Sequence, residues 1–198
     1  MNEQRSIVDK LLDECDRQAS LYSGKDIEFA QKALDLSKSI QYDTGIYESH
    51  FRIARSLMYS GNNEEAIEHL NISYSVANNL GDTIRVARAA NSYGIAFYNL
   101  GIISKSLDHL LEALEISKAN DYRDIECRVY NNICSILTEL GDHETAIEYL
   151  YTLLDKSSDT EQTIFPKCIV YRNLAHTLQN MNRIEEAEKF ADLALEES

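Results

Sequence analysis

Arginine and asparagine residues recur at a fixed spacing along this chain of 198 residues. Arg88 and Arg128 are 40 residues apart, and so are Asn91 and Asn131. The planar guanidinium group of arginine can bind a carboxylate or a phosphate through two parallel hydrogen bonds. The side-chain amide of asparagine can both donate to and accept from a peptide backbone. These residue types at this spacing suit an extended peptide that is acidic or is anchored by its C-terminal carboxylate.

Patterns that would indicate catalysis do not occur. The phosphate-binding loops GxGxxG and GxxxxGK[ST] and the nucleophile motif GxSxG are absent from the sequence. Cys127 and Cys134 are two helical turns apart on one predicted helix, about 10.5 Å, which is too far for a disulfide. We therefore predict no catalytic residues, no metal ligands and no cofactor, and we predict that the protein is not an enzyme.

The composition excludes several classes of partner. The 33 acidic residues outnumber the 19 lysines and arginines, which gives a net charge of −14. This balance argues against nucleic acid, because that affinity comes mainly from lysine and arginine, and it argues against anionic membranes for the same reason. No secretory signal, transmembrane stretch or CxxC pair is found. The sequence therefore predicts a cytoplasmic protein with reduced thiols.

The elements that position these residues form an internal repeat. The segments YSGNNEEAIEHL, NLGIISKSLDHL, ELGDHETAIEYL and NMNRIEEAEKFA align with Gly61, Gly101, Gly141 and Asn182 in register, at spacings of 40, 40 and 41 residues. Apolar stretches of about 14 to 18 residues with helical periodicity flank each of these turns. With a weaker copy before them, we predict a single array of five helical hairpins, at residues 5–40, 44–80, 83–119, 123–157 and 162–197.

The predicted helix ends have suitable residues. Glycine at the hairpin turns, or Asn182 in its place, suits the left-handed backbone that ends a helix. Asp82, Asn63 and Asp142 stand where side chains are expected to cap the first turns of helices.

The third unit has the pattern Ala87-x5-Tyr93-Gly94-x2-Phe97-x3-Gly101-x4-Ser106-x6-Ala113. This pattern resembles the tetratricopeptide repeat (TPR), and units two, four and five follow the same frame. The resemblance implies an all-α fold, a right-handed superhelix of stacked helical hairpins. The spacing departs from the usual period of roughly 34 residues. Longer spacings are similar to arrays in bacterial signalling proteins, namely sensory regions of diguanylate cyclases and histidine kinases and quorum-sensing peptide receptors.

The resemblance also predicts the binding surface, since the first helices of TPR hairpins line a concave groove. Nearly all arginines fall on or near these predicted first helices. The groove residues carried over by position are Arg55, Tyr59, Arg88, Asn91, Tyr98, Arg128, Asn131, Arg172 and His176. An alternative is that the arginines pair with Glu48, Glu126 and Glu139 on the same helices and only solvate the surface.

Three of the histidines are predicted to pack against neighbouring side chains. His69 and His109 share one repeat position, and His50 stands at a position that is aromatic in the family. Equivalent positions of adjacent repeats lie about a helix pair apart, whereas zinc ligands lie within about 2.0–2.3 Å of the metal. We therefore expect these histidines to pack in the core and not to bind a metal.

Three functions are weighed on this basis. The leading hypothesis is a non-catalytic protein- or peptide-binding module, the N-terminal sensory or regulatory region of a longer bacterial signalling protein with an output domain such as a diguanylate cyclase. The alternatives are a free-standing adaptor that forms a homodimer through apolar Phe190, Leu193 and Leu195 near the C-terminal end, or a regulator that resembles peptide-pheromone receptors. An enzyme would need an unexpected site built from side chains such as His176 and Tyr98.

Overall fold

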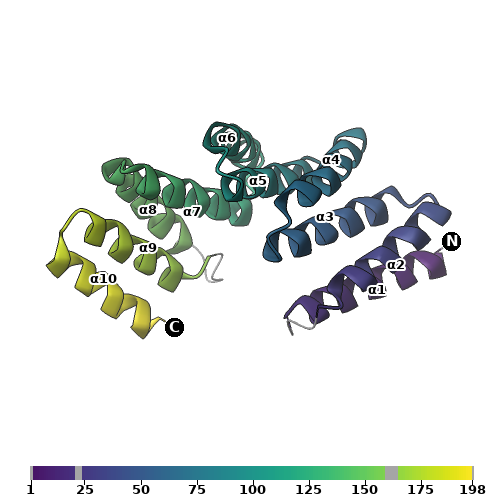
Figure 1. The fold of residues 1–198 in the computed structure, drawn as a ribbon, viewed down its shortest axis with the longest axis horizontal. Coiled ribbons are helices and arrows are strands. Elements are labelled where there is room, and N and C mark those ends of the chain that lie inside the picture. Colours follow the sequence, from purple (N-terminus) through teal and green to yellow (C-terminus); the bar gives the residue numbers. More distant parts are fainter. Residues whose placement is uncertain (1, 21–23, 159–164, 198) are drawn as a thin grey trace. The chain divides into compact units, whose positions relative to one another are not determined.

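The structure, a computed structural model, describes residues 2–20, 24–158 and 165–197. Helices make up nearly all of these residues, and no strand occurs among them, which confirms the all-α prediction (Figure 1). Residues 21–23 and 162–164 of the predicted first and fifth hairpins lie outside the described part. The helices are α1 (Asn2–Ser20), α2 (Asp26–Ser39), α3 (Asp43–Tyr59), α4 (Asn63–Asn79), α5 (Thr83–Asn99), α6 (Ile103–Ala119), α7 (Arg123–Leu140), α8 (His143–Ser158), α9 (Lys167–Asn180) and α10 (Ile184–Glu196).

The turns within hairpins have the predicted left-handed backbone. Gly61, Gly101 and Gly141 have φ angles of 84°, 73° and 82°, and Asn182 has a φ angle of 60°. Glycine adopts this conformation without a steric penalty, and asparagine tolerates it better than most residues. The conformation reverses the chain directly after the first helix of a hairpin.

The connectors between hairpins repeat a second left-handed position. Gln41, Gly81 and Asp121 have φ angles of 53°, 65° and 55°, and they are spaced by 40 residues. Two of the three are not glycine, so residue type alone did not indicate this conformation. Only the shared spacing with Gly81 could have predicted it.

Two of the three predicted helix caps are present. The carboxylate of Asp82 accepts a hydrogen bond from the Arg85 backbone N–H at 3.1 Å, and Asp142 accepts one from Thr145 at 3.4 Å. The prediction for Asn63 was wrong. Asn63 is the first residue of α4, one position inside the helix, where its side-chain amide donates to the Gly61 carbonyl.

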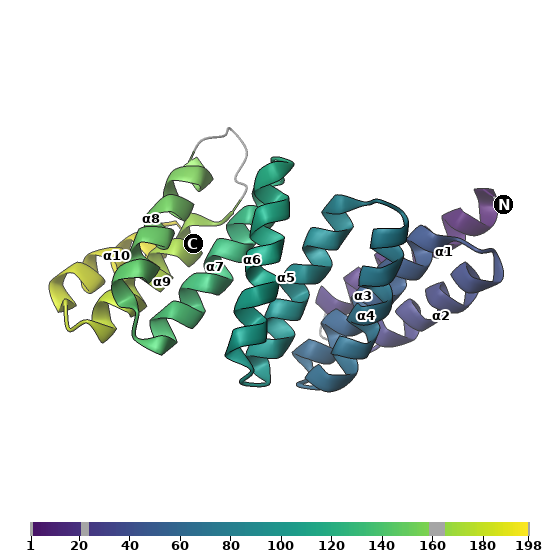
Figure 2. The ribbon, with the colours of Figure 1, turned by 90° about the horizontal axis from the view of Figure 1, so that it is seen from above.

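The helices form two compact units, Met1–His109 and Leu110–Ser198, with the boundary inside α6. In the first unit, α1 to α5 pack consecutively, and α1 and α5 each also contact α3 (Figures 1 and 2). In the second unit, α7 to α10 pack consecutively, and α7 contacts α9. Within each unit, the first helices of the hairpins therefore lie side by side. We call these surfaces the first-helix face of unit 1 (α1, α3, α5) and of unit 2 (α7, α9).

One leucine register of the second helices forms part of the core. Leu70, Leu110 and Leu150, each nine residues after a turn glycine, are all completely buried. Near the turn of the α5–α6 hairpin, the Ser106 hydroxyl donates to the Gly94 carbonyl at 2.7 Å.

The four cysteines are free thiols. Cys15, Cys127 and Cys134 are buried, and burial raises the pKa of Cys15 and Cys127 to about 11 and that of Cys134 to about 12. These three residues therefore act as small apolar core groups.

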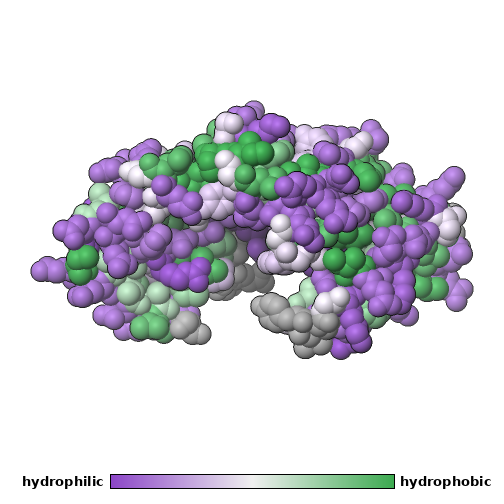
Figure 3. Space-filling model, in the orientation of Figure 1, coloured by the Kyte–Doolittle hydropathy of each residue, from purple (hydrophilic) through white to green (hydrophobic). Residues whose placement is uncertain are grey.

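The exterior is largely polar. Hydrophilic side chains cover most of the surface visible in Figure 3, with smaller apolar patches between them. No helix in the described ranges combines the length and the apolar character that crossing a bilayer requires.

Candidate protein-binding surfaces

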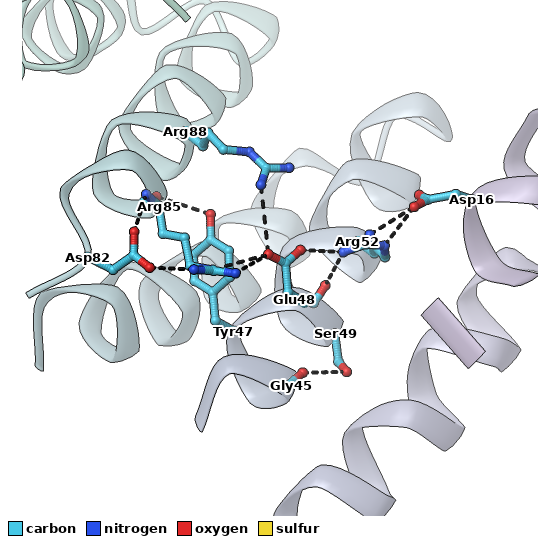
Figure 4. Close-up of polar contacts among 9 residues, drawn as sticks. All are labelled: Asp16, Gly45, Tyr47, Glu48, Ser49, Arg52, Asp82, Arg85 and Arg88. Atoms are coloured by element: carbon cyan, nitrogen blue, oxygen red, sulfur yellow. Dashed lines mark hydrogen bonds and ion pairs between the residues drawn. The ribbon is translucent and has the colours of Figure 1, made fainter. Parts of the chain in front are cut away.

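The first-helix face of unit 1 is organised around the carboxylate of Glu48 on α3 (Figure 4). Arg52, one turn along α3, donates to Glu48 Oε2, and Arg85 Nε on α5 donates to Glu48 Oε1 at 3.1 Å. Arg88 Nη1 on α5 lies 3.7 Å from the same oxygen. The Glu48 side chain is only 13% exposed, so one shielded carboxylate balances guanidinium groups from two helices.

A second carboxylate reaches this cluster from α1. Asp16 accepts hydrogen bonds from Arg52 Nη2 at 2.8 Å and from Arg55. Partial burial acts to raise the pKa of Asp16, but the hydrogen bonds from Arg55 and Arg52 outweigh it and hold that pKa below its usual value. For Arg52, burial acts to lower the pKa, and the carboxylates of Asp16 and Glu48 raise it overall. Both groups are therefore held in their charged forms.

The α5 arginines have further support. Asp82 forms an ion pair with Arg85, and the Tyr47 hydroxyl donates to the Arg85 carbonyl at 3.0 Å. The Arg85 guanidinium lies 5.4 Å from the centre of the Tyr47 ring, and that of Arg88 lies 4.8 Å from the Phe51 ring. Such cation–π contacts hold the guanidinium planes in place.

Two pockets open between the helices of unit 1. The larger, about 670 Å³, is lined by Arg55 and Tyr59 of α3 and by Asp16 and Asp26, which belong to α1 and α2. The smaller, about 330 Å³, contains Arg88 together with Glu48 and acidic residues of α1. The predicted residues Asn91 and Tyr98 are half-buried on α5 and are not among the residues that line these two pockets.

The unit 1 arginines Arg52, Arg85 and Arg88 thus pair with Glu48, in agreement with the alternative prediction that arginines form ion pairs with this residue. Sequence reasoning missed Asp16, which is 36 residues from Arg52 and 39 from Arg55. The only signal that could have identified it is the repeat spacing, because residues about one period apart lie on neighbouring first helices.

The first-helix face of unit 2 is less neutralised. Arg128 on α7 and Arg172 on α9 are exposed, and neither has an ion-pair partner within the part of the chain that the structure describes. Between the helices, Asn173 Nδ2 donates to Asn131 Oδ1 at 2.7 Å, and the hydroxyls of Thr138 and Thr177 lie 2.9 Å apart.

Arg172 and His176 share one surface of α9. Both side chains are exposed, and they line a pocket of about 390 Å³ whose other wall is α10, with Ile184 and Glu188. Glu126, one of the acids expected to pair with arginine, is instead buried at 4% exposure and pairs with Lys156 at 3.1 Å. Its side chain therefore lies in the helix packing and is not available to the exposed arginines.

The described residues include no group of three histidine, cysteine, aspartate or glutamate side chains placed to hold a metal ion. The rings of His50 and His109 pack against other rings of their hairpins: His50 against His69, and His109 against Tyr93 with centroids 4.8 Å apart. His50 is buried, whereas His69 and His109 are half-buried, so these rings pack within their hairpins but only His50 lies in the core.

Two family models described as tetratricopeptide repeat match the chain, one at residues 46–119 and the other at residues 128–155 and 170–198. Together these ranges span more than half of the sequence. The chain belongs to the tetratricopeptide repeat family. TPR proteins are typically non-catalytic interaction scaffolds, in agreement with the prediction that this chain is not an enzyme.

Known TPR structures share the fold. A putative kinesin light chain with TPR-like repeats from Podosopora anserina aligns over 100% of this chain and 96% of its own, with a TM-score of 0.75 and 14% identity. BtubC from P. vanneervenii aligns over 99% and 90%, with a TM-score of 0.70 and 17% identity. PilF from Pseudomonas aeruginosa aligns over 99% and 78%, with a TM-score of 0.73 and 18% identity.

Among curated proteins, the chain is similar to the 43 kDa receptor-associated protein of the synapse from Gallus gallus, with 24% identity over 180 residues. The match covers 83% of this chain and 42% of that relative, so the chain spans less than half of the length of the relative.

Proposed function

We propose that this TPR module binds an extended acidic peptide on the first-helix face of unit 2. The observation that carries the proposal is the pair of exposed guanidinium groups, Arg128 and Arg172, which lack a counter-charge in the described structure. Between their helices lies the Asn131–Asn173 amide pair, whose remaining donors and acceptors suit a peptide backbone. His176 extends the same surface along α9.

Unit 1 has a different role in this proposal. Arg55 and Arg88 already pair with Asp16 and Glu48, so an acidic ligand would have to displace a carboxylate that is held in place. Displacement costs the ion pairs that it breaks, which removes most of the gain in binding free energy. A ligand on the unit 1 face would therefore rely on polar contacts with side chains such as Tyr59, Asn91 and Tyr98 rather than on net positive charge.

Charge reversal on unit 2 tests the proposal. The probe is a fluorescein-labelled peptide of alternating glutamate and serine with a free C-terminal carboxylate, and binding is measured by fluorescence anisotropy. We expect the double variant Arg128→Glu and Arg172→Glu to raise the Kd at least about tenfold, because two charge-assisted contacts become repulsive.

The matched control is the double variant Arg183→Glu and Lys189→Glu, which changes the net charge equally on α10 and at its start. If the control weakens binding as much as the test variant, the peptide responds only to overall charge and the proposed site is wrong. The proposal also fails if the wild-type protein does not bind this peptide, or binds a lysine–serine counterpart equally well.

We further propose that the module is the regulatory N-terminal region of a longer bacterial signalling protein with an output domain such as a diguanylate cyclase. The spacing of 40 or 41 residues supports this setting. The second candidate is an adaptor that self-associates, which the exposure of Leu193 and Leu195 on α10 favours, at 38% and 76%. The description of the Gallus gallus relative as receptor-associated also suits an adaptor. Light scattering over a concentration series distinguishes a monomer from a dimer.

A further inference from the structure

Two histidines meet inside the α3–α4 hairpin. The Nδ1 atoms of His50 and His69 are 2.9 Å apart, and the ring centroids are separated by 4.9 Å. His50 is 3% exposed, and its Nε2 atom has no hydrogen-bond partner among the described residues. The short Nδ1–Nδ1 contact is a hydrogen bond only while at least one of the two nitrogens carries a free lone pair.

In the α5–α6, α7–α8 and α9–α10 hairpins, the residue at the register of His69 also meets a ring of the preceding helix. None of these three pairs consists of two histidines. These contacts are Tyr93–His109, Tyr130–Tyr149 and Tyr171–Phe190, with ring centroids 4.8, 5.4 and 6.0 Å apart. Tyrosine and phenylalanine gain no proton near neutral pH, whereas histidine does. Of these four ring contacts, only the α3–α4 contact therefore consists of two side chains that can be protonated in this range.

The surroundings of the pair disfavour a positive charge. Burial lowers the pKa of His50 from 6.5 to about 4, and the nearby His69 and Lys38 act in the same direction. Burial also lowers the pKa of His69, and Lys38 adds to this effect, while Glu65 and Glu68 oppose it. Lys38 lies near the end of α2, and both glutamates belong to α4.

Charged groups from α1 and α5 contact another side of α3. Glu48 accepts a hydrogen bond from Arg85 of α5, and Arg52 donates one to Asp16 of α1. Both residues are two positions from His50, and two positions correspond to about 200° around a helix. The ion-pair network and the histidine pair therefore lie on nearly opposite sides of α3. The network does not supply a counter-charge for the histidines.

We propose that the His50–His69 pair is a pH-sensitive contact, through which mild acidification loosens the α3–α4 hairpin and disturbs the first-helix face of unit 1. Helix α3 carries Glu48 and Arg55 and contributes to both pockets of that face. In the folded state the pair resists protonation, whereas in the unfolded chain both rings accept protons freely. Stability is therefore full above the ordinary histidine pKa of about 6.5 and is lost as the pH falls below it.

Thermal unfolding and NMR test this proposal together on the full chain. We expect the wild-type Tm to fall by about 4–8 °C between about pH 7.5 and pH 5, a range above the ordinary carboxylate pKa values. The double variant His50→Phe and His69→Phe, which supplies rings that cannot be protonated, should lose less than half as much. The control His176→Gln, at an exposed histidine, should behave like the wild type.

The NMR measurement does not depend on whether the double variant folds. In a titration followed by the imidazole Cε1–H resonances of the wild-type protein, we expect the midpoints of His50 and His69 to lie well below the ordinary histidine pKa of about 6.5. Amide hydrogen exchange at about pH 5 should show protection lost in α3 and α4 before α8 and α9. Midpoints for His50 and His69 at the ordinary histidine pKa of about 6.5 would overturn the proposal, and so would an equal loss of Tm in a folded double variant.

Discussion

Replacing Glu48 with alanine is expected to lower the free energy of unfolding by about 2 kcal/mol, less than the ~3–5 kcal/mol measured for fully buried ion pairs. The change leaves the guanidinium groups of Arg52, Arg85 and Arg88 close together without their shared carboxylate. The loss is moderated because Arg52 keeps Asp16 and Arg85 keeps a second acid at the start of α5. Chemical denaturation followed by circular dichroism measures the effect.

The control for this prediction is Glu28→Ala. Glu28 also forms an ion pair with a residue one turn along its helix, Lys32, but both side chains are more than half exposed. Solvent screens such a pair, so we expect no measurable loss. Equal denaturation midpoints for the Glu48 and Glu28 variants would show that the unit 1 network only solvates the surface.

Replacing Leu150 with alanine is expected to cost about 3 kcal/mol of unfolding free energy, within the range for buried leucines. Leu150 on α8 is completely buried, and α8 packs against both α7 and α9. The substitution removes apolar contact and leaves a cavity that rigid helices cannot fully close. Equilibrium unfolding in urea measures the loss, with the same dependence of the unfolding free energy on urea concentration (m) fitted to the wild type and the variant.

Leu140→Ala is the matched control in the same unit. Leu140 ends α7 and is 58% exposed, so its truncation should cost about 0.5 kcal/mol or less. If the two alanine variants were equally stable, the packing of α8 between α7 and α9 would be wrong. An intermediate cost at Leu150 would instead indicate that the neighbouring side chains relax into the cavity.

The candidate surface was predictable only in part. The repeat spacing placed Arg55, Arg88, Arg128 and Arg172 on first helices, and all four lie there. It did not distinguish the two that are ion-paired, Arg55 and Arg88, from the two that have no such partner in the described residues. That difference depends on carboxylates of neighbouring helices, which the sequence of one helix does not reveal.

By itself, the sequence determined the helical hairpins, their spacing and the backbone of their turns. These features are local: apolar periodicity selects helices, and Gly61, Gly101 and Gly141 permit the left-handed turn that ends them. The tertiary structure alone decided which charges are neutralised and which histidines meet. Asp16 reaches Arg55 from 39 residues away, and His50 meets His69 across a hairpin. Hydrogen bonds and ion pairs act over a few ångströms, so side-chain packing decides which residues of different helices become partners. The repeat period predicts which helices are neighbours, but it does not predict which of their side chains meet.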